Sequence, residues 1–96
     1  MTDSKTILIL EDNAVLGREI LEGLKLAGHK PHLIRDAGAA VQEIRELNPA
    51  LCLIDVDLTT VSGYDIVETK NRDPKAAASP VIFYSKNSTP IDGRKS

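Results

Sequence analysis

The sequence is poor in cysteine, in aromatic residues and in net charge, and these shortages exclude several classes of protein. A single cysteine, Cys52, cannot form a disulfide within the chain, so we expect a reducing, cytoplasmic location. The 12 basic and 14 acidic residues leave a formal charge of −2, too small to predict a nucleic-acid or membrane surface. No apolar run approaches the roughly 20 residues that span a bilayer. Residues 1–5 also lack the basic flank and apolar stretch of a signal peptide.

The sequence is rich in short aliphatic runs that alternate with helical periods. Three runs without polar interruption indicate strands buried on both faces, namely Ile7-Leu8-Ile9-Leu10, Leu51-Cys52-Leu53-Ile54 and Val81-Ile82-Phe83-Tyr84. A more polar run at 32–34 is typical of an edge strand. Apolar residues at helical spacing predict helices over 16–27, 37–47 and 64–71, the first ended by Gly28 and the second capped by Asp36.

The order of these elements predicts the fold class. Strands and helices alternate along the chain, which favours a doubly wound parallel α/β sheet with right-handed crossovers and helices on both faces. We expect four strands and three helices in one domain over residues 1–86. The pattern stops after Tyr84, so residues 87–96 are expected to form a flexible tail or the remnant of a missing C-terminal part.

Polar side chains follow three of the predicted strands, at the end where open α/β sheets bind ligands. Glu11 and Asp12 come directly after the run that ends at Leu10, Asp55 follows the run that ends at Ile54, and Ser85 follows Tyr84, while Asp57 lies two residues beyond Asp55. Because carboxylates held close together repel each other, a hard divalent cation between them is the economical arrangement, and Mg²⁺ fits. A carboxylate beside Mg²⁺ can attack phosphorus and form an aspartyl phosphate.

A simpler interpretation stays open for each of these residues taken alone. The segment 11–13 could merely cap the first helix, and Asp55 could be a solvated loop residue. Three acids and one hydroxyl at the same end of separate strands favour a functional site instead.

The motifs in this order resemble the receiver domain of two-component response regulators. The matching segments are Ile7–Asn13, Leu53-Ile54-Asp55, Gly63, Asn71–Pro74 and Ser79–Ser85. The resemblance covers about residues 5–86. It implies a flavodoxin-like fold, with the family's strand order 2-1-3-4 for the first four strands.

The resemblance also implies a role for each matching residue. Asp55 would accept phosphate from a histidine kinase, a phosphotransfer protein or a small acyl phosphate. Glu11, Asp12, Asp55 and the backbone carbonyl of Asp57 would bind Mg²⁺, and Ser85 would be the switch hydroxyl. The chain would be no enzyme beyond its own phosphorylation and dephosphorylation, and its output would pass through a partner protein.

Among the departures from the family pattern, one concerns the sheet and another the loop after Asp55. The fifth strand, with its Lys-Pro, and the last helices have no counterpart before residue 96, so the sheet is expected to be incomplete. An exposed fourth strand would then pair with a second copy of the chain or with a missing C-terminal segment. Thr59 stands where the family usually has proline, which predicts a less rigid loop after Asp55.

Two other functions remain open. The segment Asp55-Val56-Asp57-Leu58-Thr59 also matches the signature of haloacid-dehalogenase-like phosphatases, in which the first Asp is a nucleophile and the second a general acid/base. That family carries its lysine and further acids downstream, whereas Glu11 and Asp12 lie upstream here. A pseudo-receiver that binds a partner without phosphorylation is the second alternative, and the intact set of acids with Ser85 disfavours it.

Overall fold

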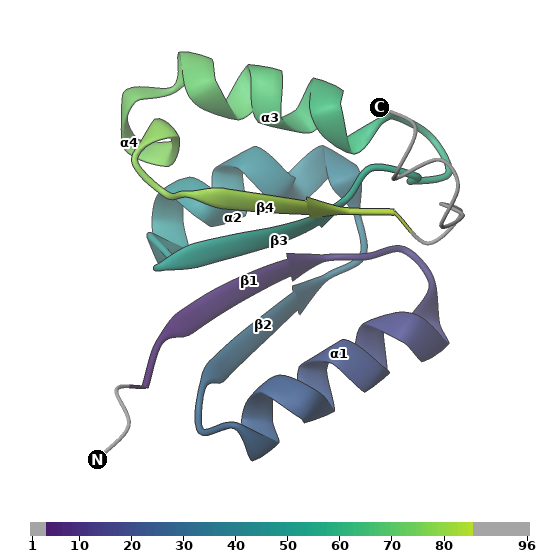
Figure 1. Cartoon of the computed structure of the whole chain (residues 1–96). Coiled ribbons are helices and arrows are strands. Elements are labelled where there is room, and N and C mark those ends of the chain that lie inside the picture. Colours follow the sequence, from purple (N-terminus) through teal and green to yellow (C-terminus); the bar gives the residue numbers. More distant parts are fainter. Residues whose placement is uncertain (1–3, 86–96) are drawn as a thin grey trace, which may run out of the picture.

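Four parallel strands form the centre of the structure, a computed structural model that describes residues 4–85 (Figure 1). They are β1 (Thr6–Leu10), β2 (Lys30–Ile34), β3 (Leu51–Asp55) and β4 (Val81–Tyr84). The order across the sheet is β2-β1-β3-β4, and every neighbouring pair is parallel. The predicted doubly wound sheet and its strand order are confirmed. The expected tail over 87–96 lies outside the described residues.

The three predicted helices are present as α1 (Ala14–Leu26), α2 (Ala40–Leu47) and α3 (Gly63–Arg72). Gly28, two residues beyond the last residue of α1, has a positive φ of 93°, a backbone conformation that often follows a helix end and that glycine tolerates best. Asp36 caps a short 3₁₀ turn, η1 (Ala37–Ala39), which leads into α2.

A one-turn helix, α4 (Pro74–Ala77), was not predicted. Asp73 and Pro74 follow the helix expected over 64–71, at a place where a proline usually closes a helix. Asp73 does follow α3, but its side chain also accepts hydrogen bonds from the amides of Lys75 and Ala76. Proline suits the first position of a helix because that position needs no amide donor, so the same two residues start α4.

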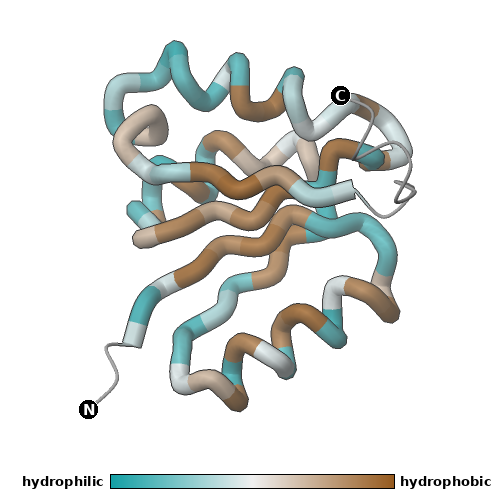
Figure 2. The backbone as a smooth tube through the Cα atoms, in the orientation of Figure 1, coloured by the Kyte–Doolittle hydropathy of each residue, from teal (hydrophilic) through white to brown (hydrophobic). Residues whose placement is uncertain are grey.

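Helices cover both faces of the sheet. Helix α1 lies on one face, and α2 and α3 lie on the other (Figure 1). Side chains alternate between the faces along each strand. The main core lies on the α2 and α3 side, and its buried members are Leu8, Leu10, Ile34, Ala40, Ile44, Cys52, Ile54 and Ala76. Ile7 and Ile9 are buried on the α1 side. Figure 2 shows the resulting apolar centre, in brown, running through β1 and β3.

Strands β2 and β4 are the outer strands of the described sheet. Lys30 and His32 give β2 the polar character predicted for an edge. On β4, the expected apolar exposure is present, since Ile82 is 53% and Phe83 38% exposed. The Phe83 ring packs against Tyr64 of α3, with ring centroids 4.6 Å apart. Within residues 4–85, no helix is both long and apolar enough to cross a membrane.

Candidate functional site

Three acidic side chains meet at the carboxyl ends of β1 and β3. Carboxylate oxygens of Glu11, Asp12 and Asp55 all lie within 4.8 Å of one another. Glu11 and Asp55 are fully buried, and Asp12 is half-buried. The two strands are parallel neighbours in the sheet, so the residues that follow them emerge side by side. The sequence pattern predicted this convergence.

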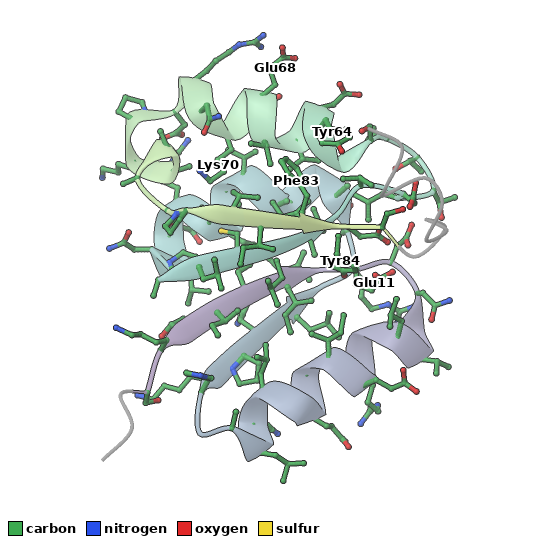
Figure 3. All side chains as sticks on the ribbon, viewed as in Figure 1. Glu11, Tyr64, Glu68, Lys70, Phe83 and Tyr84 are labelled. Atoms are coloured by element: carbon green, nitrogen blue, oxygen red, sulfur yellow. The ribbon has the colours of Figure 1, made fainter. Side chains whose placement is uncertain are left out.

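Both carboxylate oxygens of Glu11 accept hydrogen bonds. The backbone amide of Asn13 donates to Oε2 at 3.0 Å, and the hydroxyl of Tyr84 donates to Oε1 at 2.7 Å. Figure 3 shows Tyr84 reaching Glu11 from the end of β4. Asn13 also caps α1 by accepting from the amide of Leu16, so the start of α1 and the orientation of Glu11 depend on the same loop.

Backbone amides of the loop after β3 orient the other two carboxylates. The amide of Asp57 donates to Asp55 Oδ1 at 2.8 Å, and the amide of Thr59 donates to Asp12 Oδ2 at 2.6 Å. A proline at position 59 would have no N–H to donate. Thr59 therefore supplies a tie between the β1–α1 loop and the β3–α3 loop that the usual family residue could not make.

Ser85 lies beside Asp57. Its hydroxyl donates to the Oδ2 atom of Asp57, which is not one of the three clustered acids. The switch role of Ser85 and the backbone-carbonyl role of Asp57 stay predictions. The hydrogen bond nevertheless brings the residue after β4 into contact with Asp57, in the loop that follows Asp55 and β3.

Tyr84 is the site residue that sequence reasoning missed. Burial raises the pKa of its hydroxyl, and the hydrogen bond to Glu11 and the negative charges of Glu11, Asp55 and Asp12 raise it further, so Tyr84 keeps its proton and acts as a donor. A signal for it existed: Tyr84 precedes Ser85 at the end of an apolar run. Only the pairing of Tyr84 with Asp55 across β3 and β4 shows that both residues share a face.

Gly63 lets α3 start directly against the backbone of β3. A Cβ atom at this position would lie 2.3 Å from the carbonyl oxygen of Asp55 and 2.9 Å from the Cα of Val56. The amide of Gly63 also donates to the Val56 carbonyl at 3.2 Å. The close approach explains why a glycine stands eight residues after Asp55, and it fixes the loop that orients two of the carboxylates.

The three acids offer a donor set that fits a small divalent cation. Carboxylate oxygens are hard ligands of the kind that Mg²⁺ takes, and Mg²⁺ in proteins commonly uses one or two carboxylates and keeps several waters. The amide and hydroxyl donors described above are neutral, so they orient the oxygens without cancelling their charge.

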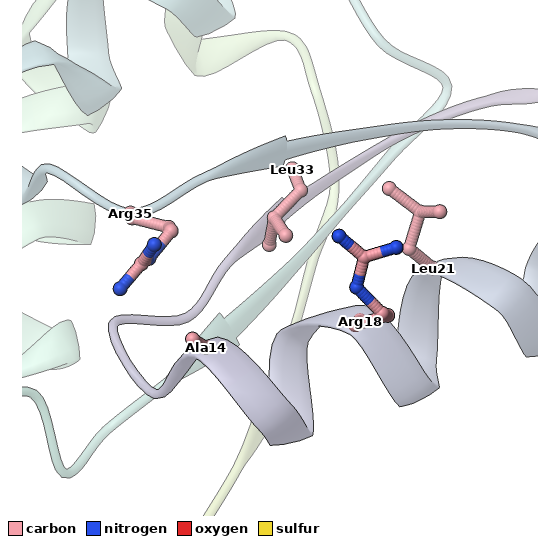
Figure 4. Close-up of a pocket in the computed structure, with 5 residues that line it drawn as sticks. All are labelled: Ala14, Arg18, Leu21, Leu33 and Arg35. Atoms are coloured by element: carbon pink, nitrogen blue, oxygen red, sulfur yellow. The ribbon is translucent and has the colours of Figure 1, made fainter.

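Apart from the acidic cluster, a pocket of about 230 Å³ lies between α1 and β2 (Figure 4). Its lining includes two arginines, Arg18 and Arg35, with Leu21 and Leu33. None of the predicted site residues lines it, and no sequence motif pointed to it.

Comparison with known proteins finds response regulators among the relatives of this chain. No family model matches the chain. The DNA-binding response regulator MtrA of Mycobacterium tuberculosis is 26% identical over 91 residues, which are 95% of this chain and 39% of that protein. The polar-differentiation response regulator DivK of Brucella abortus is 28% identical over 79 residues, 82% of this chain and 64% of DivK.

Solved structures agree on the fold. The N-terminal domain of a response regulator receiver protein from Methanoculleus marisnigri superimposes with a TM-score of 0.81 at 21% identity, over 97% of this chain and 76% of that one. The chain thus spans well under half of MtrA and about two thirds of DivK. The resemblance to response-regulator receiver domains drawn from the motifs is confirmed.

Proposed function

We propose that this chain, which is related to response regulators of two-component systems and has the receiver fold, accepts a phosphoryl group on Asp55. The observation that carries the proposal is the meeting of Glu11, Asp12 and Asp55 within 4.8 Å at the carboxyl edge of the sheet. Such a cluster is suited to phosphoryl transfer, because the transferred group is anionic and its acceptor must be held in place.

In the proposed reaction, a carboxylate oxygen of Asp55 attacks the phosphorus of the donor. A new O–P bond forms, and the P–N bond of a phosphohistidine or the P–O bond of an acyl phosphate breaks. The donor leaves with the bonding electron pair, and Asp55 becomes an acyl phosphate. The hydrogen bond from the Asp57 amide to Oδ1 holds the carboxylate in one rotation during the attack.

Glu11, Asp12 and Asp55 would hold Mg²⁺, with the backbone carbonyl of Asp57 as a further ligand. When bound, the ion supplies positive charge that offsets the carboxylates and the incoming phosphoryl oxygens. Thr59 and Asn13 contribute by fixing Asp12 and Glu11 through their amides, so that the ligand oxygens need little rearrangement.

Ser85 would exchange one acceptor for another on phosphorylation. Its hydroxyl now donates to the Asp57 carboxylate, and a phosphoryl group on Asp55 would compete with that carboxylate by offering three acceptor oxygens and a larger negative charge. The residue after β4 would then move with the phosphorylation state. Such a movement is how a change at Asp55 would reach a surface that a partner binds.

The partners we propose are a histidine kinase or phosphotransfer protein as donor and a protein that carries the output, all in the cytoplasm. The chain itself would turn over no metabolite. Ile82 and Phe83 make β4 an apolar outer strand of the described sheet, and we propose that a second copy of the chain pairs there. Sedimentation that stays monomeric across a wide concentration range would refute the pairing.

Phosphorylation by acetyl phosphate tests the proposed function. Intact-mass measurement with Mg²⁺ should show one added phosphoryl group on the wild type and none on Asp55→Asn, which keeps the shape of the residue but loses its nucleophile. Asp65→Asn, the same change at an exposed position of α3, is the matched control and should be labelled like the wild type.

Three outcomes would contradict the proposal. Labelling of Asp55→Asn would place the acceptor elsewhere, and a wild type that is never labelled would favour the pseudo-receiver. Repeated turnover of a phosphate monoester that depends on Asp55 would favour the phosphatase alternative.

A further inference from the structure

Tyr84 contacts the acidic site from two strands away. Its hydroxyl lies 2.7 Å from Glu11 Oε1, although Glu11 follows β1 and β3 separates β1 from β4. Asp55 and Tyr84 are partners in the β3·β4 register, so their side chains point to the same face. The long phenol side chain thus reaches across the end of β3, where Asp55 lies, to the acid beyond it (Figure 3).

Glu11 needs such a donor because it is fully buried. A buried carboxylate loses its hydration, and hydrogen bonds from the protein must replace it. The amide of Asn13 serves Oε2 and the hydroxyl of Tyr84 serves Oε1. Donors on both oxygens fix the rotation of the carboxylate, which sets the direction in which its remaining lone pairs point.

We infer that Tyr84 is a positioning residue for the divalent cation of this site, acting as a neutral donor that holds Glu11 in the geometry for binding. The inference rests on the proposed function, because the cation and its ligands are part of that proposal. The phenol carries no positive charge, so it orients Glu11 without repelling a bound cation. The ammonium group of a lysine at the same place would repel the cation.

The expected loss of affinity for Mg²⁺ can be taken from other metal sites in proteins. Residues that hydrogen-bond a ligating side chain typically change metal affinity by about 10–100-fold when they are removed. Tyr84→Phe keeps the ring and deletes only the hydroxyl. We expect this variant to bind Mg²⁺ about tenfold more weakly than the wild type in isothermal titration calorimetry of the full chain.

Tyr64 provides the matched control. It is 59% exposed on α3, and its ring packs against Phe83 rather than on the acidic site. Tyr64→Phe makes the same chemical change in the same chain and should leave the affinity for Mg²⁺ unchanged. Glu11→Gln, which removes a proposed ligand, should lower the affinity at least as much as Tyr84→Phe.

A spectroscopic measurement separates positioning from a merely structural role. The chain has two tyrosines and no tryptophan, so Tyr84 is the only strong emitter in Tyr64→Phe. Mg²⁺ should change the emission of Tyr84 in that variant, along the same saturation curve as the calorimetry, because the hydroxyl contacts a ligand. In Tyr84→Phe, the remaining emission of Tyr64 should not respond.

The outcomes distinguish this inference from the proposed function. A wild type that binds no Mg²⁺ overturns both. A wild type that binds Mg²⁺ together with an equally tight Tyr84→Phe overturns the positioning role alone. If circular dichroism shows that Tyr84→Phe does not fold, the emission of Tyr64→Phe decides, and an emission that is unchanged at saturating Mg²⁺ overturns the role.

Discussion

The effect of replacing Gly63 by alanine on stability can be predicted from the distance between the added Cβ atom and the backbone of β3. Replacing it by alanine adds a Cβ atom 2.3 Å from the Asp55 carbonyl oxygen, about 1 Å short of ordinary contact. The obstacle is backbone, because the next nearest atoms to the added Cβ are the Asp55 carbonyl carbon and the Val56 Cα, each 2.9 Å away. A flexible side chain could turn aside, but here the start of α3 or the end of β3 must move.

Two effects of opposite sign determine how much Gly63→Ala changes the free energy of unfolding. Alanine normally stabilises a helix by about 0.5–1 kcal/mol relative to glycine. Overpacking against an unyielding neighbour costs about 1–3 kcal/mol, and a backbone obstacle favours the upper end of that range. We therefore expect Gly63→Ala to lower the free energy of unfolding by about 2 kcal/mol, which corresponds to a melting temperature about 10 °C lower.

Gly23→Ala is the matched control for this change. Gly23 lies in α1, and a Cβ atom there would meet nothing within 4 Å, so only the helix preference acts. The free energy of unfolding of Gly23→Ala should be about 0.5–1 kcal/mol higher than that of the wild type. Urea unfolding followed by circular dichroism measures both variants against the wild type. A Gly63→Ala variant as stable as Gly23→Ala would refute the close approach of α3 to β3.

Two further predictions concern ionisable groups outside the acidic site. Burial raises the pKa of the Cys52 thiol to about 11, so a disulfide reagent at about pH 8 should label the folded chain slowly and the urea-unfolded chain quickly; equal rates would contradict the burial. Hydrogen bonds from the Ala76 amide and from the Arg45 side chain hold the pKa of Asp73 below its usual value. The ionised carboxylate therefore stabilises the folded state above about pH 4. This contribution to the free energy of unfolding is lost as the pH falls through the folded-state pKa of Asp73. The stability difference between the wild type and Asp73→Asn, measured by urea unfolding, should therefore shrink between about pH 5 and 3, and a constant difference would contradict the shift.

The sheet was predictable from sequence because its signals are local and repeated. Each of the strands β1, β3 and β4 contains an uninterrupted run of four apolar residues, and the alternation of these runs with helical periods leaves few topologies. The convergence of Glu11, Asp12 and Asp55 followed from a general rule, because ligand groups in such sheets gather past the carboxyl ends of the strands.

Features that depend on tertiary placement were not predictable. The hydrogen bond of Tyr84 to Glu11 joins residues 73 positions apart, and it requires the strand order and the register together. The tie from Thr59 to Asp12 involves a backbone amide, which any residue except proline carries, so the side chain gave no signal. Asn48, at a φ of 51° after α2, is another such case, since only the observed backbone shows that it ends the helix in the left-handed region.

The same placement explains how the three clustered carboxylates are held in position while they keep their negative charge. Four neutral donors orient the three carboxylates, namely the amides of Asn13, Asp57 and Thr59 and the hydroxyl of Tyr84. A neutral hydrogen bond fixes geometry but leaves the carboxylate charge in place. Since each donor comes from a strand end or an adjoining loop, a slip of one residue in the β3·β4 register would turn Tyr84 to the other face. The arrangement of the acidic side chains therefore depends on the pairing of the strands that carry them and their hydrogen-bond donors.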